Sequence, residues 1–285
     1  MNERAAAALL PSAKPGTRAV DATLRFARGG GRTFLARQAI PYPFHITRPH
    51  HLDLGQPDLA TLYLQSASGG LYGGDRLTLA IAAGPEARAH VTSQAATVVH
   101  TGRDIRVETH IDVAAGAWLA LTTDPYILFP GTDLSVSTNV TLAPGATAIL
   151  AEGFSPHDPA ARGAPFAHLS TATRIDAAGG GVLVDEQSHI DGPAFAAPSS
   201  PLGSYGAMGM VFILGDAAQA LDAGGLEAAL DAIDVLAGAS RLPGGAGWGV
   251  RLLARDGGRL SRGVDLVFTA GFTLLVGCAP ARRRK

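Results

Sequence analysis

Hydrophobic and polar residues alternate along three stretches of the chain, at residues 77–81, 105–113 and 134–142. In each stretch every second residue is leucine, isoleucine, valine or threonine. Successive side chains of a β-strand point to opposite faces of a sheet, so this alternation is typical of a half-buried strand. The pattern therefore predicts three strands, each with one face turned towards a core.

A glycine-containing turn follows each of these strands. The same unit recurs at residues 81–89, 113–119, 142–149 and, more loosely, 175–183. From unit to unit the glycine advances by 32, 29 and 35 positions, through Gly84, Gly116, Gly145 and Gly180. Glycine reaches the positive φ angles that a tight reversal requires, and repeated units of this length bury their apolar faces by stacking. We predict an all-β fold, either stacked β-hairpins of β-helix-like form or an ordinary β-sandwich.

Only one or two minor helices are expected. Leucine and isoleucine recur at a spacing of three or four over 226–236, which predicts a helix packed on the sheet. Asp222 or Gly225 would begin it, and Gly238 followed by Pro243 would end it.

The C-terminal segment is apolar from residue 266 to 281 and is followed by four basic residues, 282–285. It is shorter than the ~20 residues of a membrane-spanning helix, and glycines interrupt it. We expect core strands there, followed by a solvated tail. The predicted organisation is a flexible segment 1–18, a single β-rich domain 19–277 and a basic tail 278–285.

The composition favours a protein-binding role over nucleic-acid binding. Hydrophobic residues make up 47% of the 285 residues, and charged residues only 16%. The 23 basic and 24 acidic residues nearly cancel, whereas nucleic-acid binding requires a clustered basic surface. A charge-poor surface tolerates association with other proteins. The one cysteine, Cys278, excludes a disulfide framework within the chain, and the cytoplasm is the expected location.

No common catalytic motif is present. The glycine cluster 69–75 is followed by an alternating strand rather than by the helix that a phosphate loop requires, so we expect a turn in which Asp75 accepts backbone amides. An alternative function, a hydrolase or lyase on a β-scaffold, would use Asp75, Glu152, His157 or Asp158 as acid and base. His157 and Asp158 are also weak candidates for a metal site.

Three segments carry a specific resemblance: Gly69–Leu77, Val91–Thr97 and Asp124–Gly131. The first reads GGLYGGDRL, the second VTSQAAT and the third DPYILFPG. Together with SRLPGG at 240–245 and VRLL at 250–253, they resemble, in order and spacing over residues 20–255, the urease accessory protein D family, UreD or UreH.

The resemblance implies a non-enzymatic urease maturation chaperone with a helix-poor, stacked β-fold. It implies binding to apo-urease subunits and to UreF, contact with the GTPase UreG through UreF, and a dimer through the accessory complex. No tightly bound cofactor, nucleic acid or membrane is expected, only transient nickel. The family residues expected in the scaffold or an interface are Gly69, Gly70, Gly73, Gly74, Asp75, Pro125, Phe129 and Pro130.

The resemblance further implies an internal passage for nickel, for which Thr92, Gln94 and Thr97 are the candidate lining. Neutral oxygens let an ion move without holding it tightly. The alternative for these residues is hydrogen bonding between stacked strands. The chain departs from the family pattern at 98–100 and over 262–277, which leaves a divergent paralogue or a purely structural β-repeat protein as further alternatives.

Overall fold

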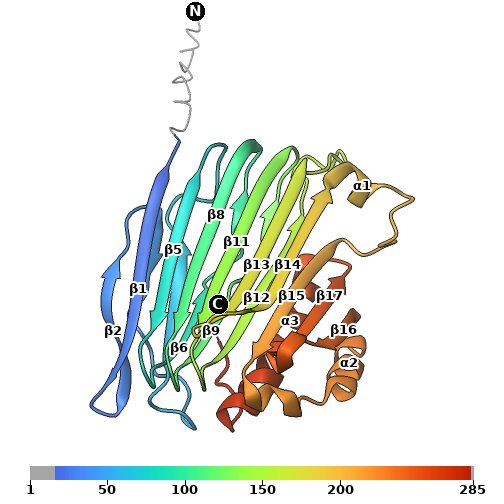
Figure 1. Ribbon diagram of the computed structural model, residues 1–285. Helices are drawn as coiled ribbons and strands as arrows, with labels where there is room; N and C mark the ends of the chain where they lie inside the picture. The colour runs from blue at the N-terminus through green and yellow to red at the C-terminus, as the bar shows by residue number, and fades with distance from the viewer. Residues whose placement is uncertain (1–16, 284–285) are drawn as a thin grey trace, which may run out of the picture.

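Two β-sheets face each other and hold most of the hydrophobic core between them. The computed structural model describes residues 17–283. Figure 1 shows one sheet running across the front of the molecule and the second behind it, with the orange and red helices at the lower right. The all-β prediction is confirmed, since strands account for 49% of the chain and helices for 16%.

Sheet A has seven strands in the order β14-β13-β11-β8-β5-β1-β2. Its strands are β1 (Ala19–Gly29), β2 (Arg32–Ala39), β5 (Arg76–Ala83), β8 (Gly102–Val113), β11 (Thr132–Leu142), β13 (His168–Ala177) and β14 (Val182–Asp191). The five central strands are parallel, and β2 and β14 pair with them in antiparallel fashion.

Sheet B has ten strands, with the main path β16-β17-β15-β12-β9-β6-β4-β3 and a short pair, β7 and β10, beside β12. Its strands are β3 (Phe44–Ile46), β4 (Ala60–Ser66), β6 (Arg88–Ser93), β7 (Val98–Val99), β9 (Trp118–Thr122), β10 (Tyr126–Leu128), β12 (Thr147–Pro156), β15 (Ala207–Leu214), β16 (Val235–Arg241) and β17 (Gly247–Ala254). Strands β4, β6, β9 and β12 are parallel.

The repeated turns join the two sheets. The fold therefore has both the stacked coils of a β-helix-like protein and the two facing sheets of a sandwich. Each turn carries the chain from a strand of sheet A into a strand of sheet B, from β5 to β6, from β8 to β9 and from β11 to β12. The chain then returns to sheet A beside its previous strand, so successive coils stack in parallel. The prediction that each turn closes a hairpin is therefore wrong for the first three units and holds only for the fourth, between β13 and β14.

The register of the stack corrects the alignment of the repeat. Ala83 pairs with Val113, which pairs with Leu142, which pairs with Ala177. Gly84 therefore corresponds to Ala114 and not to Gly116. The turn residues with positive φ are Glu86 (59°), Gly116 (67°) and Gly145 (70°), so a glutamate occupies in the first coil the position that glycine holds in the next two.

Three helices and two short 3₁₀ segments complete the fold. The helices are α1 (Gly192–Ala196), α2 (Ala223–Asp231) and α3 (Gly257–Val276), and the 3₁₀ segments span 216–220 and 243–245. Asp222 caps α2 as expected, but α2 ends at Asp231, and Leu236 lies in β16, so the predicted helix 226–236 is too long. No helix among the described residues is long and apolar enough to span a membrane.

The prediction of core strands over 266–281 is wrong, because α3 covers the outer face of sheet B there. Buried residues recur along α3 at three- and four-residue spacing, from Leu260 to Phe272. Its internal glycines do not break it. A Cβ added to Gly271 would lie 3.1 Å from side-chain atoms of Ile149 and Ile213, so glycine lets the helix approach the sheet closely.

The C-terminal tail is not solvated as far as it is described. Arg283, with a side chain 9% exposed, forms an ion pair of 2.9 Å with Asp53, whose side chain is fully buried. The backbone amide of Ala281 also donates to Asp53, at 2.7 Å. At the other end of the chain, Arg18 bonds to the buried Asp75, while the predicted flexible segment otherwise lies mainly outside the described residues.

Candidate functional site: a cavity between the two sheets

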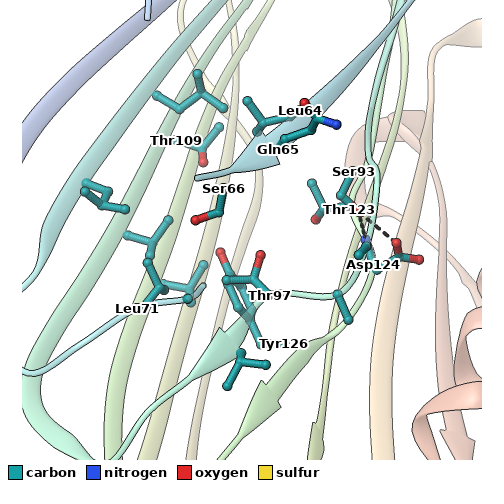
Figure 2. A pocket seen from close by; sticks show the side chains of 18 of the residues that line it. Leu64, Gln65, Ser66, Leu71, Ser93, Thr97, Thr109, Thr123, Asp124 and Tyr126 are labelled. Atoms are coloured by element: carbon teal, nitrogen blue, oxygen red, sulfur yellow. Dashed lines mark hydrogen bonds between the residues drawn. The ribbon is translucent and has the colours of Figure 1, made fainter. Parts of the chain in front are cut away.

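A cavity of about 290 Å³ lies between the sheets, where the family-like segments converge. The end of β4, the glycine-rich loop after it, the segment after β6 and strand β10 all contribute to its wall (Figure 2). The apolar part of the lining comes from core positions such as Leu71, Leu77 and Val136. The polar part consists of Gln65, Ser66, Ser93, Gln94, Thr97, Thr109, Thr123, Asp124, Tyr126, Thr138 and Glu152.

A threonine ladder crosses the inner face of sheet A. Thr109 of β8 pairs with Thr138 of β11, which pairs with Thr173 of β13. Neighbouring strands lie about 4.8 Å apart, so the ladder presents one hydroxyl per strand towards sheet B. Thr109 and Thr138 line the cavity, and the Thr173 hydroxyl donates to the Glu152 carboxylate at 3.3 Å.

Glu152 is the ionisable group that the fold perturbs most clearly at this site. It lies on β12, half-buried between the sheets. Burial raises the pKa of Glu152 to about 7, and the nearby Glu186 carboxylate adds to the rise, while the hydrogen bond from Thr173 opposes it. Burial, followed by the charge of Glu152, raises the pKa of Tyr126 to about 12. The cavity therefore contains a carboxyl group that titrates near neutral pH.

Ser93 and Asp124 form a second polar group in the lining of the cavity. The Ser93 hydroxyl donates to the Asp124 carboxylate at 2.9 Å and accepts the Asp124 backbone amide at 2.7 Å, as the dashed lines in Figure 2 show. Gln65 donates to the side-chain oxygen of Gln94 at the exposed end of the same wall. The Ser93–Asp124 bonds join the end of β6 to the segment after β9, and the Gln65–Gln94 bond joins β4 to the segment after β6.

The glycine-rich loop is pressed against the segment after β6. The backbone amide of Leu71 donates to the Val98 carbonyl oxygen at 2.9 Å. Gly70 has a φ of 138°, and an added Cβ would lie 2.4 Å from that same oxygen, so only glycine fits. Gly69 and Gly70 line the cavity, whereas Gly73 and Gly74 hold the outer part of the loop against residues 102–103 and 17.

Asp75 organises this loop, as the sequence predicts. It is 1% exposed and accepts the backbone amide of Tyr72 at 2.8 Å and the Arg18 Nε–H at 2.8 Å. The Arg18 guanidinium lies over the Tyr72 ring, 5.4 Å from its centroid, and the Tyr72 ring stacks on His100 at 4.4 Å. All these contacts tie the loop to its neighbours and leave the carboxylate fully engaged.

The third family-like segment closes the same end of the sandwich. The Pro125 side chain is buried, and β10 begins at the next residue. Phe129 lies between two imidazoles, 5.3 Å from the centroid of His100 and 5.9 Å from that of His157. The Pro130 carbonyl oxygen accepts the Thr101 hydroxyl at 2.7 Å. The segment thus packs against the residues that follow the second family-like segment.

The predicted passage residues separate into two groups. Gln94 and Thr97 line the cavity. Thr92 lies on the opposite face of β6 from Ser93, outside that lining, and its hydroxyl donates to the Thr122 carbonyl oxygen at 2.7 Å. For Thr92 the observed contact is the hydrogen bond between stacked strands that was the alternative interpretation.

The four residues of the hydrolase alternative do not converge. Of Asp75, Glu152, His157 and Asp158, only Glu152 lines the cavity. Asp158 accepts the amides of residues 160, 162 and 164, and these bonds lower its pKa. Within residues 17–283, no group of three histidine, cysteine, aspartate or glutamate side chains is placed to hold a metal ion.

Sequence reasoning missed the threonine ladder, although the chain carries a signal for it. Thr109, Thr138 and Thr173 are separated by 29 and 35 positions, the same steps that separate Gly116, Gly145 and Gly180. Repeat spacing applied to polar residues, and not only to glycines, would have found the ladder.

Comparison with known proteins gives one consistent family. The model of the UreD urease accessory protein family matches residues 18–285. Urease accessory protein UreD 1 of Methylorubrum extorquens (strain PA1) is 55% identical over 286 residues, which cover 99% of this chain and 97% of that protein. Urease accessory protein UreD 3 of Bradyrhizobium sp. (strain ORS 278) is 43% identical over 270 residues, with 94% and 95% coverage. Urease accessory protein UreD 1 of Pseudomonas syringae pv. syringae (strain B728a) is 32% identical, with 90% and 91% coverage.

Proposed function

Because this chain belongs to the UreD urease accessory protein family, and is thus a non-catalytic urease maturation protein involved in nickel metallocentre assembly, we propose that its inter-sheet cavity is a passage for Ni²⁺. The ion is cargo in this proposal and not a resident cofactor. The single observation that carries the proposal is the threonine ladder facing Glu152.

The chemistry of this lining suits transit better than storage. Hydroxyl oxygens replace part of the hydration shell of a cation, and a carboxylate adds attraction. One carboxylate beside the ladder attracts the ion without completing a set of ligands that would trap it. Since the pKa of Glu152 is raised to about 7, replacing its proton by a cation near neutral pH requires little free energy.

We propose the partners from the same family membership. The protein binds apo-urease subunits and UreF, and it reaches UreG through UreF, with a dimer forming through the accessory complex. Exposed side chains on the outer face of sheet A, along β8 and β13, offer a surface for such an assembly. Co-purification of the full-length chain with each partner, expressed together and separately, tests these contacts.

The passage is tested by urease activation in cells that lack the native gene and grow with limiting nickel. We expect Glu152→Gln combined with Thr138→Val to lower urease activity while co-purification with the partners persists. Glu108→Gln is the matched control, because Glu108 is exposed on the outer face of sheet A, with a side chain 47% accessible. Full activity of the double variant with nickel limiting would refute the passage.

A further inference from the structure

The outer face of sheet A carries two neighbouring arginines at its β1–β2 end. Arg25 of β1 and Arg37 of β2 lie directly opposite each other in the antiparallel register, and both are exposed. Within the part of the chain that the structure describes, neither forms an ion pair. Like charges directly opposite each other destabilise a strand pair.

A β-bulge is responsible for this juxtaposition. The register shifts between Arg25, which pairs with Arg37, and Phe26, which pairs with Leu35, so that Ala36 is the extra residue of β2. Leu35 packs towards the core. On a regular strand, residue 37 would face the same side as residue 35, and the bulge instead turns Arg37 outward beside Arg25.

Two arginines farther along the same face lie beside a carboxylate. Arg106 lies 2.8 Å from Asp104, and Arg174 lies 2.9 Å from Asp176. Elsewhere on the face, then, a carboxylate of the same chain accompanies each of these cations. At the β1–β2 end no carboxylate of the described residues forms an ion pair with Arg25 or Arg37, which leaves both guanidinium groups available to an anion of another molecule.

A surface groove of about 580 Å³ begins at these two arginines. It runs across the ends of the strands where the inter-sheet turns start, and its floor is built largely of alanine, including Ala36, Ala82 and Ala114. Small side chains leave room for another backbone to approach the sheet closely. Asp112 also lines the groove, which favours a peptide of mixed polarity over the uniform negative charge of a nucleic acid.

We propose that this groove, headed by Arg25 and Arg37, docks an acidic segment of a partner protein. Two adjacent guanidinium groups match carboxylates of such a segment, and neutralising them relieves the repulsion between the paired strands. The occupant is a protein in keeping with the proposed function, but the site is separate from the inter-sheet cavity and does not depend on nickel transit.

Binding of a labelled peptide of alternating glutamate and serine to the purified full-length protein, followed by fluorescence anisotropy, tests the proposal. We expect salt-sensitive binding that Arg25→Ser with Arg37→Ser weakens by about tenfold. Arg106→Ser, on the same face, is the control and should change binding little. The double variant should be at least as stable as the wild type, because it removes a like-charge pair.

Three results would overturn the proposal: no binding by the wild type, equal binding by the double variant, or tighter binding of a single-stranded oligonucleotide of equal charge. Failure of the proposed function is recognised separately. If the wild-type protein does not support urease activation with limiting nickel, the proposed function is refuted. The peptide-binding measurement still tests the groove by itself.

Discussion

Replacing Glu152 with glutamine should stabilise the protein increasingly as the pH rises. The substitution keeps the shape of the side chain and the oxygen that accepts the Thr173 hydroxyl. It removes a carboxyl group whose pKa burial raises from 4.5 to about 7. Because the folded protein holds this proton more tightly than the unfolded chain, ionisation of Glu152 works against folding.

The magnitude follows from the two pKa values. Below about pH 4.5 the group is protonated in both states, and Glu152 contributes no penalty. The stability relative to glutamine is then lost as the pH rises, until the folded state also ionises at about 7. The shift corresponds to about 3 kcal/mol in full, with about 1 kcal/mol expressed at pH 5.

Urea unfolding of both proteins between about pH 5 and about pH 8 measures this difference, and other titrating groups cancel in the comparison. Thr173→Val provides a second arm, since it removes the hydrogen bond that lowers the pKa of Glu152 and should extend the window to higher pH. A difference between wild type and Glu152→Gln that stays constant across this range would refute the argument that Glu152 is buried with a raised pKa.

Two further substitutions test the C-terminal region. Arg283→Ala should destabilise the protein by about 3–5 kcal/mol, because it leaves the buried Asp53 carboxylate without its cation. Arg282→Ala, at the exposed neighbouring position, should have little effect, and equal urea midpoints for the two variants would contradict the buried pair. Gly271→Ala should destabilise by about 1–3 kcal/mol through overpacking of α3 against sheet B. Gly238→Ala, where an added Cβ meets nothing within 4 Å, is its control in thermal unfolding, and similar losses in both would argue against the close approach.

The strands and their turns could be predicted from local pattern, but their connections could not. Alternation at 105–113 and 134–142 identifies β8 and β11 because each strand buries one face. Whether the turn after a strand forms a hairpin or crosses to a second sheet depends on which distant strand pairs with it. The glycines alone also give the wrong alignment of the repeated units. In the first coil Glu86 adopts the positive φ that glycine adopts in the later coils.

The candidate site was predictable only in part, because it too depends on which distant strands the fold brings together. Gln94 and Thr97 were identified through family likeness, and the cavity does include them. Thr92 was grouped with them because it lies in the same segment, although strand alternation places it on the other face of β6. Glu152 drew attention only as a generic acid, since its raised pKa arises from burial that a sequence does not display.

The antiparallel strands at the ends of the stack limit its length. A stack of parallel coils can in principle grow into a filament, because its last strand offers an edge on which another chain can continue the series. In sheet A the outermost strands β2 and β14 run against the coils, and in sheet B β3 and β15 do the same beside β4 and β12. A second copy therefore meets no edge that continues the parallel series at either end, which lets a repeat-built protein exist as a discrete particle.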